Sequence, residues 1–424
     1  QEHWLRQPKE YGSREPRYTV AVSYTRRREM GGTGEPPTTK PGQEPILTRA
    51  KGWTLGVILF LTALLGCFYI LTPLLPFLFL SPRVWRRLTD RLIGFWIAMP
   101  GALMEYIFGS TVRVVGHRVD HGEPALIIMN HRTRLDWLFF WTALYKVDPW
   151  LLISEKISLK GILKYIPGAG WAMQSMGFIF LDRAFANDRS KMETLLDYYA
   201  NSGFAYQLLL FPEGTDKCPL ASARSEKHAK EKGLTNYEYL LHARTTGFVH
   251  MVQRMRRNNY IKYLYDVTIG YSGDQIVQSE VHLISNGLAP TNVHYQIIRI
   301  PIEVLPATDD GLAEWLAKRW EEKEEKLRKF YSRTNKESET FSIPEGGSEF
   351  EMTTFLSRAR LFIICFWVFV STMWLYFAYA MSWFALLAVG SSAFFLGAQK
   401  LYGGVEWLMI ERFNAVELEE SCEH

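Results

Sequence analysis

The feature that most constrains the fold of this chain is a long stretch without any charged residue, residues 361–399. Its length suits two membrane-spanning helices of roughly 20 residues each, with a turn at Ser382 or within residues 390–392. One long helix buried in a soluble core is the alternative, but soluble helices average about 11–12 residues. The sequence therefore predicts a C-terminal transmembrane hairpin within residues 357–400.

A second uncharged segment, residues 54–80, is also long enough to enter a bilayer. Pro73 and Pro76 disfavour a straight helix. Basic residues flank the segment on both sides, which suggests that both ends face the cytoplasm. We therefore expect a helical hairpin that dips into one leaflet, with a single span as the alternative. Residues 84–108 mix basic and apolar positions, and we expect a helix on the membrane surface, broken at Pro100.

The region after residue 109 has the alternating pattern of an α/β domain. Six short runs rich in apolar and β-branched residues indicate buried strands: "TVRVV", "ALIIM", "GFIFL", "YQLLLF", "YDVTIGY" and "HYQIIRIPI". Helical stretches such as "METLLDYYA" alternate with them, and a charged helix spans residues 311–331. Alternation of this kind predicts a mixed sheet with flanking helices.

The composition of the 424 residues excludes some kinds of protein, and the remaining segments divide the chain into six predicted parts. The net charge of +4 gives no sign of nucleic-acid binding. The four cysteines are scattered, so we expect neither a disulfide framework nor a metal site. The six parts are a disordered polar tail (1–50), membrane-embedded and interfacial helices (51–108), an α/β domain ending in the charged helix (109–331), a linker (332–356), the transmembrane hairpin (357–400) and a tail (401–424).

Three of the predicted strands end in conspicuous polar groups. Asn130 and His131 follow "ALIIM", Asp182 and Arg183 follow "GFIFL", and residues 212–215 (Pro-Glu-Gly-Thr) follow "YQLLLF". Ligands of open α/β sheets bind outside the carboxyl ends of the strands. If these strands are neighbours, all three groups face one crevice, and Asn130 is then a candidate substrate-binding residue.

His131 and Asp136 are five residues apart, which is a poor spacing for one face of a helix. They can meet if His131 ends the strand and Asp136 lies in the first turns of the next helix. Asp136 would then accept a hydrogen bond from one imidazole nitrogen and leave the other ready to take a proton. This is a general base without a nearby serine or cysteine nucleophile. Its simplest reaction is to deprotonate a substrate hydroxyl, which then attacks an activated acyl group.

The "FPEGT" run adds candidate binding residues. Its Pro and Gly suit a tight turn, whose backbone amides can cradle a phosphate. Glu213 is expected to accept a hydrogen bond from a hydroxyl or to fix the loop, with Gly214 and Thr215 beside it. Arg183 would pair with a phosphate in the crevice, unless it forms a salt bridge with a neighbouring aspartate.

Further basic residues extend the candidate site. Lys156, Lys160 and Lys164 recur every four residues and would share one face of a helix. That face, including Lys156, could contact lipid headgroups or the phosphates of coenzyme A, or it could simply face solvent. Arg244, in "LLHARTTGF", is one more candidate phosphate ligand.

With these residues assembled, the chain resembles the glycerolipid (lysophospholipid) acyltransferase family. The resemblance rests on the Asn-His and Asp of residues 130–136, on "GFIFLDR" and on "FPEGT", which occur in the family's order. It covers residues 52–332, and "LKGILKYIPGAGWAMQ" and "YEYLLHARTTGF" are most similar to the lysocardiolipin acyltransferase subgroup. Two departures concern Asp216, where many family members carry Arg, and Ala243, where the subgroup usually has Pro before "RTTGF".

The resemblance implies a role for five of the candidate residues. His131 would be the base and Asp136 its partner, while Glu213, Gly214 and Arg183 would hold the headgroup region of a lysophospholipid. The donor would be acyl-CoA as co-substrate, with no bound cofactor and no metal. The family also implies a multi-pass enzyme of the endoplasmic reticulum membrane whose active site faces the cytosol.

We therefore expect an acyl-CoA:lysophospholipid O-acyltransferase. It would move a fatty acyl chain to the free hydroxyl of a lysocardiolipin, lysophosphatidylinositol or lysophosphatidylglycerol acceptor by direct attack, without an acyl-enzyme. Its partners would be acyl-CoA, the lysophospholipid and the bilayer, and not nucleic acid. One rival is a 1-acylglycerol-3-phosphate acyltransferase that makes phosphatidic acid. Another is a non-catalytic membrane scaffold that uses residues 311–331 to bind partners.

Overall fold

The computed structural model describes residues 44–182, 185–272, 276–332 and 340–422. The strands are β1 (Thr111–Gly116), β2 (Ala125–Met129), β3 (Glu155–Lys160), β4 (Ile179–Leu181), β5 (Gln207–Leu210), β6 (Tyr263–Ser272), β7 (Asn292–Pro301) and β8 (Ser348–Phe350). The helices are α1 (Ile46–Gly66), α2 (Thr72–Leu80), α3 (Pro82–Phe108), α4 (Asp136–Val147), α5 (Leu151–Ser154), α6 (Ala169–Ser175), α7 (Phe185–Asn201), α8 (Pro219–Lys232), α9 (Thr245–Arg257), α10 (Glu280–Asn286), α11 (Asp309–Tyr331), α12 (Thr354–Ala380), α13 (Ser382–Leu401) and α14 (Val405–Cys422).

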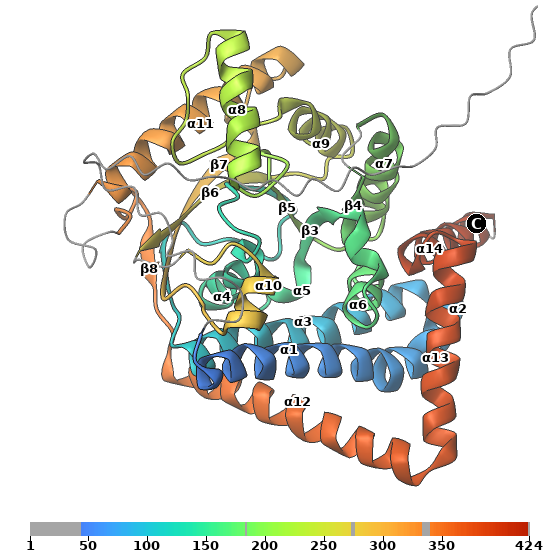
Figure 1. The fold of residues 1–424 in the computed structure, drawn as a ribbon. Helices are drawn as coiled ribbons and strands as arrows, with labels where there is room; N and C mark the ends of the chain where they lie inside the picture. Colours follow the sequence, from blue (N-terminus) through green and yellow to red (C-terminus); the bar gives the residue numbers. More distant parts are fainter. Residues whose placement is uncertain (1–43, 183–184, 273–275, 333–339, 423–424) are drawn as a thin grey trace, which may run out of the picture. The chain divides into compact units, whose positions relative to one another are not determined.

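These strands form one mixed sheet in the order β4-β3-β5-β2-β6-β7-β1-β8 (Figure 1). The pairs β6–β7 and β1–β8 are antiparallel and the others are parallel. Successive residues of a strand face opposite sides of a sheet. On β6, Asp266 pairs with Lys323 of α11, whereas Tyr271 packs against Phe139 of α4. Helices α11 and α4 therefore cover opposite faces, and the predicted α/β fold with flanking helices is confirmed.

The six strands expected from the sequence are all present, but two further strands were missed. β3 occupies Glu155–Lys160, so the helix predicted from the lysine spacing is wrong. The start of this segment is fully buried between β4 and β5, and burial in the sheet overrides the apparent helical period. β8 pairs with β1 inside the predicted linker, so that part of the linker belongs to the sheet.

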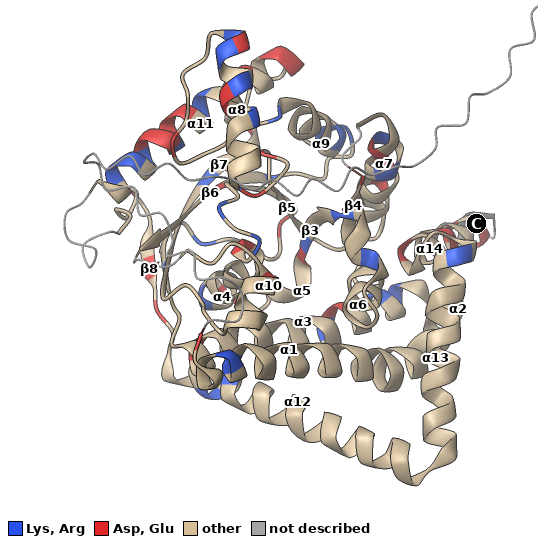
Figure 2. Ribbon diagram, viewed as in Figure 1, with Lys and Arg blue, Asp and Glu red and all other residues tan. Residues whose placement is uncertain are grey.

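Three helical stretches are long and apolar enough to cross a membrane: Ile46–Leu80, Thr354–Ala380 and Ser382–Leu401. Charged residues gather on α8, α9 and α11 and are almost absent from α12 and α13 (Figure 2). The two C-terminal helices meet at Met381, next to the turn expected at Ser382. The chain is thus a membrane protein by the length and composition of these helices.

The N-terminal apolar segment contains no internal hairpin turn. It continues as one helix through a π-helical turn at Cys67–Leu71, and the chain reverses only at Ser81, before α3 (Figure 1). Pro73 and Pro76 have no backbone N–H to donate to the helix. The π-helical turn just before them accommodates the missing hydrogen bonds, so the helix continues. The break expected at Pro100 is also absent, because that part of α3 is buried and packing holds the helix together.

The predicted C-terminal tail is instead a helix for most of its length. α14 runs over Val405–Cys422, and Leu408, Met409 and Phe413 are buried. With buried Val405 they follow the spacing i, i+3, i+4 and i+8, so they lie on one face that packs against the rest of the protein. The expectation of a disordered tail for residues 1–50 falls mostly outside the described residues.

Candidate active site

His131 and Asp136 meet as the sequence predicts. Strand β2 ends two residues before His131, and Asp136 is the first residue of α4. His131 Nδ1 lies 2.9 Å from Asp136 Oδ2, and the two side chains are 14% and 0% exposed. The strand-to-helix turn therefore brings together two residues whose spacing would separate them on a regular helix.

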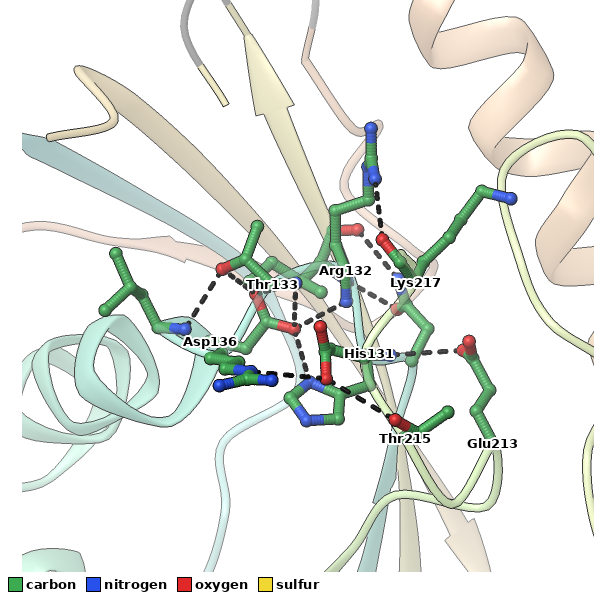
Figure 3. A network of polar contacts seen from close by, with 12 residues as sticks. His131, Arg132, Thr133, Asp136, Glu213, Thr215 and Lys217 are labelled. Atoms are coloured by element: carbon green, nitrogen blue, oxygen red, sulfur yellow. Dashed lines mark hydrogen bonds and ion pairs between the residues drawn. The ribbon is translucent and has the colours of Figure 1, made fainter. Parts of the chain in front are cut away.

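The Asp136 carboxylate is held by several donors (Figure 3). Its Oδ2 accepts hydrogen bonds from the backbone N–H groups of Arg132 at 2.6 Å and Thr133 at 3.1 Å. Its Oδ1 accepts from the hydroxyls of Thr133, at 3.1 Å, and of Tyr271 on β6. These bonds satisfy a buried charge and fix the carboxylate with Oδ2 directed at the imidazole.

Glu213 holds the same segment from another side. Its Oε1 accepts from the backbone N–H of His131 at 3.1 Å, and its Oε2 accepts from that of Leu241 at 3.0 Å. Burial raises the pKa of Glu213 to about 7. Glu324 of α11 accepts from the backbone N–H groups of residues 238–240. The two carboxylates thus fix the loop beside His131, which is the loop-fixing role expected for Glu213; its contact with a headgroup stays a prediction.

Gly214 and Arg244 lie side by side next to this loop. Gly214 has φ +72°, in the left-handed region that favours glycine. A Cβ at Gly214 would lie 3.3 Å from Cδ and Nε of Arg244. The backbone N–H of Arg244 donates to Pro212 O at 2.8 Å, and Thr215 Oγ1 donates to Asp216 Oδ1 at 3.4 Å. The structure therefore brings Arg244 to the "FPEGT" loop, and its role as a phosphate ligand stays a prediction.

Two other candidates already have protein partners. Asn130 is buried, and its side chain donates to Ile269 O at 3.1 Å and accepts from Ile269 N at 2.9 Å, which ties β2 to β6. Lys156 is 0% exposed and its Nζ lies 2.8 Å from Asp90 Oδ1. Lys156 therefore presents no surface to a headgroup, because the segment is a buried strand rather than an exposed helix.

The strand that precedes the third polar group is not a neighbour of β5 or β2. Strand β3 lies between β4 and β5, so the condition that the three strands be neighbours holds only for β2 and β5. Asp182, after β4, pairs with Lys191 at 2.6 Å. Arg183 lies outside the described residues, and its pairing with a phosphate stays a prediction.

Sequence reasoning missed several residues that surround His131. Thr133 and Tyr271 hold Asp136, but a lone Thr or a Tyr in a distant strand carries no local signal. Arg132 and Lys217 lie beside His131, and Lys217 N donates to His131 O at 2.9 Å. The basic residues in "HRTRLD" and "EGTDK" were the available signal.

The arrangement is suited to proton transfer. His131 Nδ1 is engaged by Asp136, and the ring stacks on Phe211 with 4.2 Å between centroids. Within the described residues, His131 Nε2 has no hydrogen-bond partner and no serine or cysteine bonds to it. The same residues contain no cluster of His, Cys, Asp and Glu that could hold a metal. A His–Asp pair of this kind, on a protein with three helices apolar enough to cross a membrane, fits an enzyme that acts at a membrane.

Comparison with known proteins gives the family. A family model described as Acyltransferase matches residues 111–272, and one described as Acyltransferase C-terminus matches residues 284–367. "Lysophosphatidylinositol acyltransferase 10" of Caenorhabditis elegans is 38% identical over 87% of this chain and 95% of that protein. "Lysocardiolipin acyltransferase 1" of Gallus gallus is 40% identical over 84% of this chain and 93% of that protein. The protein of that name from Danio rerio is 42% identical over 65% of this chain and 70% of that protein. The chain belongs to the glycerolipid acyltransferase family, and the resemblance seen in the sequence is confirmed.

Proposed function

We propose that this protein is an acyl-CoA:lysophospholipid O-acyltransferase. The observation that carries this proposal is the His131–Asp136 pair, in which one imidazole nitrogen is engaged by a buried carboxylate and the other has no described partner. Family membership supplies the reaction class. The similarity to proteins named lysocardiolipin and lysophosphatidylinositol acyltransferase supports a lysophospholipid of these kinds, or of the lysophosphatidylglycerol kind, as the acceptor.

The proposed reaction needs one base and no protein nucleophile. His131 Nε2 accepts the proton of the acceptor hydroxyl as its oxygen attacks the thioester carbonyl of acyl-CoA. The carbon–sulfur bond breaks, the new ester is released, and the proton passes from His131 to the coenzyme A thiolate. Asp136 keeps the imidazole in the tautomer with its proton on Nδ1 and stabilises the imidazolium that forms.

The surrounding loop gives each further candidate a place in this proposal. Glu213 holds His131 by its backbone. The turn around Gly214, together with Arg244 and Arg183, would receive the acceptor phosphate. The apolar helices would keep the crevice at the bilayer, in the endoplasmic reticulum membrane and on its cytosolic side, where acyl-CoA is available.

A second candidate acceptor is lysophosphatidic acid. A protein named "Probable 1-acyl-sn-glycerol-3-phosphate acyltransferase 5" from Arabidopsis thaliana is 31% identical over 65% of this chain. Both kinds of acceptor present a phosphate and a free hydroxyl, so the same base serves either. A panel of acceptors separates the two.

The deciding experiment measures acyl transfer from labelled acyl-CoA to lysocardiolipin, lysophosphatidylinositol, lysophosphatidylglycerol and lysophosphatidic acid. Membranes carry wild type or His131→Ala. Loss of a general base should lower the rate by about 10²-fold or more. The acceptor that reacts fastest identifies the substrate. Equal rates in wild type and His131→Ala would refute the mechanism and favour a non-catalytic scaffold.

A further inference from the structure

Two basic side chains beside His131 have no acidic partner among the described residues. Arg132 follows the catalytic histidine, and Lys217 follows the "FPEGT" loop. Arg132 Nη1 lies 3.5 Å from Lys217 O, so the two residues are in contact. Both are half-buried, and within the part of the chain that the structure describes neither forms an ion pair. Two like charges held together in this way favour an anion as their partner.

The nearby carboxylates are committed elsewhere. Glu213 uses both oxygens for the backbone N–H groups of His131 and Leu241. Glu324 uses both for residues 238–240. Burial first, and then the charge of Arg132, lowers the pKa of Lys217. The charges of Glu213, Glu324 and Glu238 act on Lys217, but none of the described carboxylates forms an ion pair with Lys217 or Arg132.

A helix end adds to the positive potential. Lys217 Nζ donates to Ser222 Oγ at 3.2 Å, and Ser222 lies in the first turn of α8. That turn contains no acidic residue. The N-terminal end of a helix carries a partial positive charge, so it strengthens the attraction of an anion to Lys217.

The direction of the side chains separates this pair from the base. In Figure 3 the imidazole of His131 points to one side of the chain, whereas the side chains of Arg132 and Lys217 point to the opposite side. An anion held by the pair would therefore not lie on the proton-accepting nitrogen. It would be a part of a substrate that is remote from the reacting atoms.

We propose that Arg132 and Lys217 form a phosphate-binding subsite for a non-reacting end of a substrate. This inference rests on the proposed function, because an acyltransferase of this kind binds two phosphate-bearing substrates. The phosphate comes either from coenzyme A, which carries phosphates far from its thioester, or from a second phosphate of a lysocardiolipin-type acceptor. Both sources share the chemistry of a phosphate ester.

The test is a split between KM and kcat. Arg132→Gln and Lys217→Gln should each raise one KM by roughly tenfold or more, as expected for a lost bond to a charged group. They should change kcat little. One outcome is a raised KM for acyl-CoA. If the difference in KM between variant and wild type becomes smaller with 3′-dephospho-acyl-CoA as the donor, the bound phosphate is that of the donor. A raised KM for lysocardiolipin, but not for a lysophospholipid with one phosphate, identifies the acceptor's second phosphate.

Matched controls and a binding measurement complete the design. Lys227→Gln removes an exposed lysine of α8 that pairs with Glu231, and it should leave both KM values unchanged. Inorganic pyrophosphate should raise the Tm of the purified wild type but not that of the Arg132→Gln/Lys217→Gln double variant. Unchanged KM values in both single variants, or equal Tm shifts in wild type and double variant, would overturn the subsite. A wild type inactive on every acceptor would instead refute the proposed function, and the Tm comparison would still decide the subsite.

Discussion

The protein contains two buried polar clusters that look alike by composition and differ in what they leave available. In the first, His131 is joined to Asp136. In the second, Asp90 of α3 accepts from Arg86 at 2.7 Å and from Lys156 of β3 at 2.8 Å. Both clusters place a carboxylate at 5% exposure or less beside a basic side chain. In the first cluster the nitrogen without a described partner, His131 Nε2, belongs to a side chain that is 14% exposed, whereas in the second the nitrogen without a described partner, Arg86 Nε, belongs to a side chain that is 1% exposed.

The second cluster is closed by its own members. Tyr206 donates to the remaining oxygen of Asp90 at 2.9 Å, and Arg86 also donates to Ser175 O at 2.6 Å. Such a network links α3 to the sheet, and its side chains are too buried to reach a substrate. The comparison shows that a buried charged cluster indicates a reactive site only where one of its side chains is accessible to a substrate.

Breaking the first cluster, that of His131 and Asp136, should have the largest effect. Asp136→Asn keeps the shape of the side chain but removes its charge, so it no longer stabilises an imidazolium. We expect kcat to fall by about 10³-fold. Acyl transfer at saturating substrate measures this effect, and circular dichroism of the purified variant checks that the fold is retained. A kcat within tenfold of wild type would contradict the assigned role.

Breaking the closed cluster should affect stability instead. Asp90→Ala leaves Arg86 and Lys156 buried without their carboxylate, which typically costs about 3–5 kcal/mol. Denaturant unfolding in detergent should show this loss in the free energy of unfolding. Molecules that remain folded should keep a kcat close to that of wild type. Normal stability with a strongly reduced kcat would reverse the comparison.

The dependence of stability on pH should distinguish the two clusters by a smaller effect. The group concerned is Glu213, which accepts a hydrogen bond from the backbone of His131 in the first cluster. The pKa of Glu213 is raised to about 7, so between about pH 4.5 and 7 the folded protein holds a proton that the unfolded chain has lost. Stability should therefore fall as pH rises through this window, by at most about 3 kcal/mol, and then level off. Glu213→Gln should flatten this slope in thermal unfolding.

The matched variant for this series is Lys156→Met in the closed cluster. Burial lowers the pKa of Lys156 to about 8, so its titration begins above the window of Glu213. Lys156→Met should leave the slope between pH 4.5 and 7 unchanged. If Glu213→Gln keeps the wild-type slope, Glu213 is not the group that titrates there.

The smallest effect should come from single hydroxyls. Tyr271→Phe removes one donor to Asp136 and should lower kcat about three- to tenfold, as for a hydrogen bond worth about 1 kcal/mol. Tyr206→Phe removes the equivalent donor to Asp90 and should lower the Tm without changing kcat. Parallel measurement of both quantities sharpens the comparison. Equal changes in kcat would show that the two clusters are coupled.

The strands and the base could be predicted because their signals are local. Six apolar runs became six strands, and the position of His131 between a strand and a helix predicted its contact with Asp136. The prediction for Lys156 was wrong because the spacing of Lys156, Lys160 and Lys164 suits a helix. In the structure Lys156 lies in a buried strand and its ammonium group pairs with Asp90. The separation of Asp182 from the crevice depends on the insertion of β3 in the strand order, and no local pattern encodes that order.

The strand order also has a consequence for folding during synthesis on the ribosome. β1 lies between β7 and β8, so the first strand to leave the ribosome has neither partner until Asn292–Pro301 has followed. At about 5–20 residues per second this wait lasts roughly ten seconds or more. During that time both edges of β1 are open to other chains, so the nascent protein needs shielding until its last strands arrive.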